Sequence, residues 1–377
     1  MKILIVSYHF YPKNTPRAFR THELVKEFCK RGFDVTLILP KQVEYINEID
    51  PQLKGIKNLE VVLLGEMTAF AKPSVSKLLN KENRFRKVAK DVYRYFNPYT
   101  ETRPYIDLVY RYLRNSSTKY DKIISIAHPF STLVGTAKAI RSNPILKSCP
   151  IKVAEYSDPF SLQKSVRMFF GYKIVDRWIA KTFDYISIPT EKAIESYKKI
   201  KEVDRIKVIP QGFNFDNVEL SNYIKNSVPS FGYAGVFYEN IRNPDVLFKF
   251  LLSINFDFKF HVFTSPTNKD TNDIIDKYKK RLNEKLIVSY DLPRLELIRE
   301  LSSLDFLINI DNLSDNQVPS KLIDYSLTQR PIYSFSQDNF QTEIFLKFMN
   351  GDYKDSLRIN IDEFDIKTVT DKFLSLV

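Results

Sequence analysis

Short runs of apolar, mostly β-branched residues recur along the chain, and stretches with helical spacing of apolar positions separate them. The first run, Lys2–Tyr8, predicts a buried strand, and the pattern from about Pro16 to Arg31 predicts a helix that ends at Gly32. A second apolar run, Asp34–Pro40, follows directly. A strand, a helix and a strand in this close succession form a βαβ unit, which implies a parallel sheet.

The same alternation continues along the chain in two series. Buried strands are predicted at Leu59–Leu64, Lys122–Ala127, Ile151–Tyr156, Tyr185–Thr190 and Ile206–Gly212, and then at Ser230–Gly235, Lys259–Ser265, Leu286–Asp291, Asp305–Asp311 and Pro331–Ser336. We therefore expect an α/β protein with two Rossmann-like, parallel-sheet domains that face each other across a cleft. The expected division is an N-terminal domain of residues 1–200, a second domain of residues 201–350, and a C-terminal segment, 351–377, that packs back toward the first domain.

Charge is distributed unevenly between these two domains. The chain has 377 residues, with 57 Lys and Arg against 45 Asp and Glu, a net charge of +12. Residues 1–200 hold 35 bases and 19 acids, a net +16, whereas residues 201–377 hold 22 bases and 26 acids, a net −4. The positive half suits an anionic partner, so the two halves are expected to bind different partners.

Residues 72–94 concentrate the positive charge, with eight bases and two acids among apolar residues. Phe85, Val88, Val92 and Phe96 recur at spacings of three and four, which predicts one face of a basic amphipathic helix. Such a helix can lie on an anionic membrane surface, where each base contributes about 1 kcal/mol. The alternative is a solvated helix that packs its apolar face on its own domain.

The sequence argues against several classes of protein. Cys29 and Cys149 have neither Cys-x-x-Cys nor Cys/His spacing, so a disulfide framework or a structural zinc site is not expected. No apolar run is long enough to predict a membrane span, and no signal peptide is recognised. We expect a cytoplasmic protein, peripheral on the inner face of the membrane if residues 72–94 bind lipid. No RNP, helix-turn-helix or zinc-finger pattern indicates a nucleic-acid partner.

Several segments, in the same order along the chain, resemble the GT-B glycosyltransferases of the retaining type 4 family, which use nucleoside diphosphate sugars as donors. The resemblance is carried chiefly by VPSKLIDYSLTQRPI (318–332), with support from IKVIPQGFNFD (206–216), FGYAGVFYENIRNP (231–244), AHPFSTLVG (127–135) and YSDPF (156–160). It implies that the second domain binds the nucleoside diphosphate sugar and that the first domain binds a lipid-linked or glycan acceptor.

The resemblance also implies a set of donor-binding residues. Asp324 stands where the family has its ribose-binding glutamate, and a carboxylate is a natural acceptor for two neighbouring hydroxyls. Arg242 and Lys321, with Ser320 at the start of a helix, are expected to hold the diphosphate, and Gly212 completes the set. The alternatives are an exposed acid in a first helical turn for Asp324, and surface bases or weak ion pairs for Arg242 and Lys321.

Several positions depart from the family pattern; Thr264 and Ser265, for example, end a predicted strand where relatives often have glycine. The first glutamate of the family's paired motif is replaced by Asn316, whose amide lacks the charge of a carboxylate. Asn316 is nevertheless retained as a donor-binding candidate. The glycine pair of the first loop is replaced by NTPRAFR, residues 14–20. In that loop Arg17 or Arg20 would bind a donor or acceptor phosphate by charge instead of by close backbone approach.

Two histidines and an aspartate at predicted strand ends are the candidates for the chemistry of transfer. The resemblance implies that His128 contacts the transferred sugar and that Asp158 lies beside the acceptor, while His9 opens towards the same cleft. The alternatives are a hydrogen-bonded histidine at a strand terminus for His128 and a turn-forming Asp-Pro pair for Asp158. In the family's favoured mechanism the leaving diphosphate takes the acceptor proton, so cations at the phosphates matter more than a general base.

We therefore expect a retaining, metal-independent hexosyltransferase of bacterial polysaccharide type that needs no cofactor. The chain contains no Asp-x-Asp element, which would hold a divalent ion. Two alternatives stay open. One is an epimerase of nucleotide sugars on the same fold, which would need carboxylates for proton abstraction; the other is a non-catalytic basic protein that binds membranes.

Overall fold

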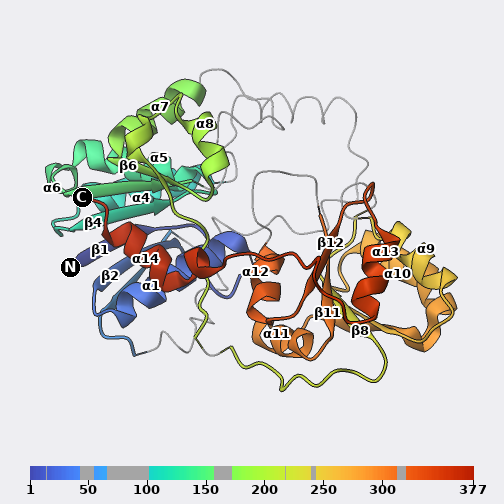
Figure 1. The fold of residues 1–377 in the computed structure, drawn as a ribbon. Coiled ribbons are helices and arrows are strands. Elements are labelled where there is room, and N and C mark those ends of the chain that lie inside the picture. Colours follow the sequence, from blue (N-terminus) through green and yellow to red (C-terminus); the bar gives the residue numbers. More distant parts are fainter. Residues whose placement is uncertain are drawn as a thin grey trace, which may run out of the picture. The chain divides into compact units, whose positions relative to one another are not determined.

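In the computed structural model, residues 1–13, 15–42, 55–65, 102–156, 172–216, 218–238, 243–311 and 320–377 are described. The chain divides into two compact units: unit 1 contains Met1–Asn214 and Phe364–Val377, and unit 2 contains Phe215–Glu363. Each unit is built on one parallel sheet with helices on its faces, coloured along the sequence in Figure 1. The prediction of an α/β fold with two parallel sheets is confirmed.

The sheet of unit 1 has the strand order β3-β2-β1-β4-β5-β6-β7, and neighbouring strands pair in parallel. Its strands are β1 (Lys2–Val6), β2 (Asp34–Pro40), β3 (Leu59–Leu64), β4 (Lys122–Ile126), β5 (Ile151–Glu155), β6 (Tyr185–Ile188) and β7 (Ile206–Val208). The central strands are mostly apolar because helices cover both faces of the sheet. The chain order reverses between β1 and β4, which makes the carboxyl ends of these strands the topological switch point of unit 1.

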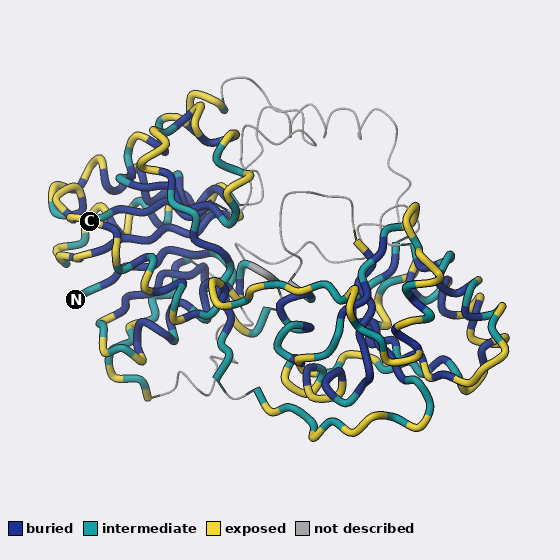
Figure 2. The backbone as a smooth tube through the Cα atoms, viewed as in Figure 1, coloured by how far each residue is buried: buried dark blue, intermediate teal, exposed yellow. Residues whose placement is uncertain are grey.

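Two apolar cores lie on opposite faces of this sheet. Leu24, Phe28 and Phe373 belong to the core under α1 and α14, which pack against each other (Figure 1). Val109 and Leu133 belong to the core under α4, α5 and α7. The helices of unit 1 are α1 (Pro16–Lys30), α4 (Arg103–Arg114), α5 (Ser131–Ser142), α6 (Pro144–Lys147), α7 (Tyr172–Thr182), α8 (Ile194–Tyr197) and α14 (Ile366–Leu374). Figure 2 shows buried strands and helices that are exposed on their outer sides.

The sheet of unit 2 has the order β10-β9-β8-β11-β12 and is also parallel. Its strands are β8 (Ser230–Ala234), β9 (Lys259–Thr264), β10 (Leu286–Tyr290), β11 (Phe306–Ile310) and β12 (Ile332–Phe335). The order reverses between β8 and β11, so the switch point of unit 2 lies at the carboxyl ends of these two strands.

Helices again cover both faces of the sheet in unit 2. One core, which includes Phe248, Tyr278 and Phe345, lies under α9 (Asp245–Ser253), α10 (Lys269–Leu282) and α13 (Thr342–Met349). A smaller core, which includes Leu301 and Tyr325, lies under α11 (Arg294–Ser302) and α12 (Ser320–Leu327). Complete burial of each such side chain contributes about 1.5–3 kcal/mol. The apolar spacing of these helices is therefore what attaches them to the sheet.

The boundary between the units differs from the one expected from the sequence. β7 pairs with β6 and completes the first sheet, so unit 1 extends to Asn214 instead of ending at residue 200. The chain that enters unit 2 is held by Asp305, whose carboxylate accepts hydrogen bonds from Tyr223 Oη and from the backbone N–H of Ser230. The segment 351–377 is divided: residues up to Glu363 belong to unit 2, and α14 packs on α1.

Candidate functional site

The carboxyl ends of the strands carry most of the described residues that the sequence singled out. In open parallel sheets, ligands bind outside these ends, where the strand order reverses. In unit 1 this point lies between β1, which leads to His9, and β4, which leads to His128. In unit 2 it lies between β8, which leads to Gly235, and β11, after which α12 begins at Ser320. Each unit therefore has its own candidate site.

His9 and His128 lie at the switch point of unit 1. Within the described part of the chain, Nδ1 of His9 is buried and has no hydrogen-bond partner. Burial, with the positive charges of Lys13, His128 and Arg17, lowers the pKa of His9 to about 4. The imidazole is therefore uncharged at neutral pH and can both donate and accept a hydrogen bond. His128 is exposed and has a φ of 70°, which is uncommon for a residue with a side chain.

Arg17 reaches the same edge of the sheet from the first turn of α1. This helix begins there because the Thr15 side chain accepts a hydrogen bond from the Ala18 N–H and because Pro16 suits the first helical position. Nη1 of Arg17 lies 3.0 Å from Oε2 of Glu155, the last residue of β5, and the two side chains are 14% and 2% exposed. Arg17 is thus partly accessible, whereas Glu155 is buried.

Arg20 lies one turn further along α1 and points into unit 1. Its Nε lies 3.3 Å from Glu155 Oε1, and its Nη atoms donate to the carbonyl oxygens of Ile209 and Pro210. Burial lowers its pKa to about 10, an effect that Glu155 opposes, so the guanidinium stays charged at neutral pH. The prediction that Arg20 binds a phosphate is corrected, because its side chain is 2% exposed and protein acceptors surround it.

Gly212 packs closely against the start of α14 in unit 1. A Cβ at this position would lie 2.6 Å from Cδ1 of Ile366 and 3.3 Å from Cβ of Val369, so a side chain here would displace Ile366 at the start of α14. The next residue, Phe213, donates a backbone hydrogen bond to Phe364 and accepts one from Ile366. Gly212 therefore has a packing role in unit 1, and its expected part in donor binding stays a prediction.

Lys321, in the first turn of α12, lies at the switch point of unit 2. Its Nζ is 4.8 Å from the centre of the Tyr233 ring on β8 and 3.4 Å from the carbonyl oxygen of Ile310, the last residue of β11. The Tyr325 hydroxyl accepts a hydrogen bond of 2.7 Å from the Ala234 N–H, which fixes α12 against the end of β8. An ammonium group and a helix N-terminus therefore meet at the carboxyl ends of β8 and β11, an arrangement suited to an anion.

Asp324 lies in the second turn of α12 and pairs with Arg294, the first residue of α11. Nε and Nη2 of Arg294 donate to Oδ1 of Asp324 at 2.9 and 2.6 Å, and the two side chains are 24% and 17% exposed. Burial raises the pKa of Asp324, and the charge and hydrogen bonds of Arg294 oppose this rise. Asp324 is therefore a partly buried carboxylate held in one orientation, and the alternative of an exposed first-turn acid is wrong.

Some of the predicted residues lie outside the described residues. These are Asp158, Arg242 and Asn316, together with the basic segment 72–94. Ser320 is the first residue of α12, next to Lys321. Across the described ranges, none of the helices combines the length and apolar character needed to cross a membrane.

Two residues of the candidate sites were missed by the sequence analysis. Glu155 ends the strand β5, and Arg294 follows β10 after a short turn in which Asp291 has a φ of 51°. The available signal was their position, since each is a charged residue at or just beyond the carboxyl end of a predicted strand. Their partners, Arg17 and Asp324, lie on other elements and could not be paired with them without the fold.

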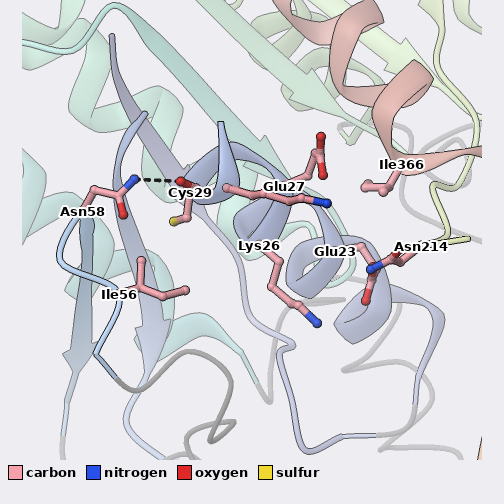
Figure 3. Close-up of a pocket in the computed structure, with 9 residues that line it drawn as sticks. Glu23, Lys26, Glu27, Cys29, Ile56, Asn58, Asn214 and Ile366 are labelled. Atoms are coloured by element: carbon pink, nitrogen blue, oxygen red, sulfur yellow. Dashed lines mark hydrogen bonds between the residues drawn. The ribbon is translucent and has the colours of Figure 1, made fainter. Parts of the chain in front are cut away.

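A pocket of about 440 Å³ lies in unit 1, and Ile366, which packs against Gly212, is among the residues that line it (Figure 3). It is formed by α1, the turn before β3, Asn214 and the start of α14, and its lining residues are Glu23, Lys26, Glu27, Cys29, Lys30, Ile56, Asn58, Asn214 and Ile366. The Asn58 side chain donates to the Cys29 carbonyl oxygen at 3.0 Å, which ties the turn to the helix (Figure 3). None of the predicted site residues lines this pocket.

No family model matches the chain, and no curated protein matches it. Solved structures of low sequence identity do match. A glycosyltransferase from Rickettsia africae ESF-5 has a TM-score of 0.61 at 11% identity and covers 99% of this chain and 96% of that chain. TarM has a TM-score of 0.61 at 11% identity, with 99% and 98% covered. Anabaena HepE in complex with UDP-glucose has a TM-score of 0.57 at 11% identity, with 99% and 98% covered.

These similarities identify the architecture of the chain. Its two parallel α/β sheets, of seven and five strands, match those of GT-B glycosyltransferases over nearly the whole length. The expected α/β fold with two parallel-sheet domains is therefore confirmed.

Proposed function

We propose that this chain is a glycosyltransferase that moves a sugar from a nucleoside diphosphate sugar to a lipid-linked or polysaccharide acceptor, with retention of configuration and without a metal ion. The observation that carries the proposal is the position of Lys321 and Asp324 on one helix at the switch point of unit 2, in a fold shared with glycosyltransferases. HepE was solved with UDP-glucose and a variant of S. aureus TarM with UDP, so UDP-sugars are the first donors to test.

In the proposed donor complex, the diphosphate lies beside Lys321 and the N-terminus of α12, where an ammonium group and backbone N–H groups stabilise its charge. Arg242 supplies a second cation. Asp324 accepts hydrogen bonds from the ribose hydroxyls, and Asn316 contacts the transferred sugar. The contacts to the diphosphate strengthen as charge develops on it in the transition state, and contacts of this kind accelerate the transfer.

In the proposed acceptor complex, the residues at the carboxyl edge of unit 1 receive the glycosyl group. His128 contacts the transferred sugar, and Asp158 lies beside the acceptor hydroxyl. His9, uncharged at neutral pH, exchanges hydrogen bonds with sugar hydroxyls. Arg17 binds an anionic group of the acceptor or donor, since its side chain remains partly accessible beside Glu155.

The surface of unit 1 supports a further part of the proposal, association with an anionic membrane. The exposed sides of α4, α5 and α7 carry many bases and, within the described helices, the single exposed acid Asp107. The bases are Arg103, Arg111, Arg114, Lys138, Arg141, Lys173, Arg177 and Lys181. The Arg141 guanidinium lies 5.6 Å from the centre of the Trp178 ring, so an indole accompanies the charges. Aromatic and basic groups together suit a lipid headgroup layer.

The two other functions are less well supported. An epimerase would need a carboxylate that abstracts a proton from the sugar. Glu155 and Asp324 are each paired with an arginine, which stabilises the ionised carboxylate and makes it a weaker base. A non-catalytic membrane protein would leave the positions of Lys321, Asp324 and Arg294 without an explanation.

The experiment is a transfer assay with a panel of nucleoside diphosphate sugars in the presence of lipid-linked and polysaccharide acceptors. We expect release of the nucleoside diphosphate to depend on the acceptor, and nuclear magnetic resonance of the product to show the anomeric configuration of the donor. Chelation of divalent ions should leave the rate unchanged. Conversion of the donor to its epimer without an acceptor would instead support the epimerase.

A further inference from the structure

We infer that Arg294 is a positioning residue for the donor: it holds one oxygen of the Asp324 carboxylate and leaves the other for the ribose. The inference deepens the proposed function and rests on it. Arg294 lies outside all the segments on which the resemblance to a known family rests.

Arg294 donates to one of the two carboxylate oxygens of Asp324. Both hydrogen bonds from Arg294, at 2.9 and 2.6 Å, end on Oδ1 of Asp324. Among the described residues, no hydrogen bond is found to Oδ2. A planar guanidinium that donates twice to one oxygen fixes the plane of the carboxylate, which otherwise rotates freely about its last bond. The orientation of Oδ2 is therefore set before any ligand arrives.

The position of Arg294 on its own helix is unfavourable for a base. Arg294 is the first residue of α11, where the macrodipole favours acids and disfavours bases. Glu296, in the same turn, has the sign that the helix end prefers. Asp324 lies in the second turn of α12, beyond the first turn in which the macrodipole stabilises acids. Neither side chain is placed to stabilise its own helix. The positions of Arg294 and Asp324 are therefore accounted for by their contact with each other across the two helices.

Arg294 also affects the charge state of Asp324. Burial raises its pKa, and of the charged groups in the described residues only Arg294 is found to oppose this rise. Lys321, on the same helix, directs its Nζ to the Ile310 carbonyl oxygen and the Tyr233 ring, and Glu296 and Arg299 of α11 are exposed. Without Arg294 the carboxyl group would take up a proton more readily. A protonated carboxyl accepts fewer hydrogen bonds than a carboxylate, so ribose binding would weaken.

The test measures the affinity of the full chain for UDP-glucose by calorimetry from pH 5.5 to pH 8.5. The variants are Arg294→Gln, Arg294→Lys and Asp324→Asn, with Arg299→Gln as the control on the same helix. At each pH the wild-type affinity is divided by that of the variant. The ionisation of the nucleotide affects both affinities equally and so does not affect this ratio. We expect Arg294→Gln to lose about tenfold in affinity near neutral pH.

The pH dependence of this ratio separates a positioning role from a structural one. For Arg294→Gln the loss should be largest at low pH and should shrink as the pH rises and Asp324 ionises. Arg294→Lys should keep a flat ratio because the positive charge remains, and Arg299→Gln should match the wild type. A loss that does not vary with pH, or wild-type affinity in Arg294→Gln beside a loss in Asp324→Asn, would overturn the inference. Wild-type affinity in Asp324→Asn would instead overturn the proposed donor site.

If Arg294→Gln does not fold, the affinity of Arg294→Lys at one pH is the test. Lysine keeps the charge but cannot place two donors of a planar group on one oxygen. Affinity equal to the wild type would therefore contradict the proposal that Arg294 fixes the orientation of the carboxylate.

Discussion

Arg17 and Glu155 join the start of α1 to the end of β5 through an ion pair of 3.0 Å. The same carboxylate lies 3.3 Å from Nε of Arg20, so one buried acid serves two guanidinium groups. Two guanidinium charges share one carboxylate, so one positive charge is left unneutralised. Arg17 lies close enough to His9 for its charge to contribute to the low pKa of the imidazole. Unit 1 therefore presents a positive edge at its switch point, organised around one acid that is itself inaccessible.

Replacement of Glu155 by glutamine should destabilise the protein strongly. The variant leaves the buried Arg20 charge without its partner, and loss of one member of a buried ion pair costs about 3–5 kcal/mol. Urea denaturation measures the difference in the free energy of unfolding. The matched control is Glu195→Gln, which removes an exposed pair with Lys198 and should cost at most about 1 kcal/mol. Equal effects in the two variants would contradict the assigned role of Glu155.

The stability of the protein should fall on acidification partly because of His9. The pKa of His9 is about 4 in the folded protein against its ordinary value of 6.5. Between these values the unfolded chain binds more protons than the folded one, so the free energy of unfolding rises with pH across this window. The variant His9→Gln lacks this pH-dependent part of the free energy of unfolding. The difference in free energy of unfolding between wild type and variant should therefore change between pH 4 and pH 6.5 and be constant above pH 6.5. A difference that is constant over the whole range would contradict the low pKa.

Gly212→Ala should reduce stability and leave nucleotide affinity unchanged. The added Cβ would meet Ile366 at 2.6 Å, and overpacking of this kind costs about 1–3 kcal/mol. In an Ile366→Ala background the side chain that blocks the Cβ is absent, so the cost of Gly212→Ala should shrink. A double-mutant cycle measured by urea denaturation gives this coupling. Additive effects, or a loss of UDP-glucose affinity in Gly212→Ala, would show that the packing explanation is incomplete.

Substitution of three bases on the exposed face of α4 and α5 should weaken binding to anionic vesicles. The change is Arg111→Gln, Arg114→Gln and Arg141→Gln together, and the expected loss is about 3 kcal/mol at about 1 kcal/mol per base. Sedimentation with phosphatidylserine vesicles measures it. The matched control changes Lys269, Lys280 and Arg281 on α10, which are also exposed. The membrane proposal fails if both triple variants bind the vesicles alike.

The strands of both sheets could be predicted from the sequence because each is a short apolar run with a polar or turn residue at its end. The boundary between the units could not, since β7 has the same local pattern whichever sheet it joins. Only its pairing with β6 assigns it to unit 1. The same limit applies to the C-terminal segment, which is divided at Phe364 by packing against distant parts of the chain.

For the candidate sites, too, the sequence predicts what a local motif contains but not what distant parts of the chain contribute. Lys321 and Asp324 are found from a local motif, and the structure brings Lys321 to the switch point, as expected for a residue that follows β11. Gly212 lies in a segment that resembles the family and Arg20 in a loop that departs from it, but the side chains around them, Ile366 in one case and Glu155 in the other, come from distant elements. A residue's type and spacing do not reveal whether the fold buries it, so sequence alone could not separate Arg17 from Arg20.

The central claim is that the carboxyl edge of unit 2 binds the nucleotide of the donor through Asp324. The most direct measurement is the calorimetric affinity of the wild type, Asp324→Asn and the control Asp257→Asn for UDP-glucose at pH 7.5. Asp257 precedes β9 at the opposite edge of the sheet and pairs with Lys285 on the surface. We predict that the wild type and Asp257→Asn bind alike and that Asp324→Asn binds at least about tenfold more weakly. Equal affinity in all three proteins would contradict the claim.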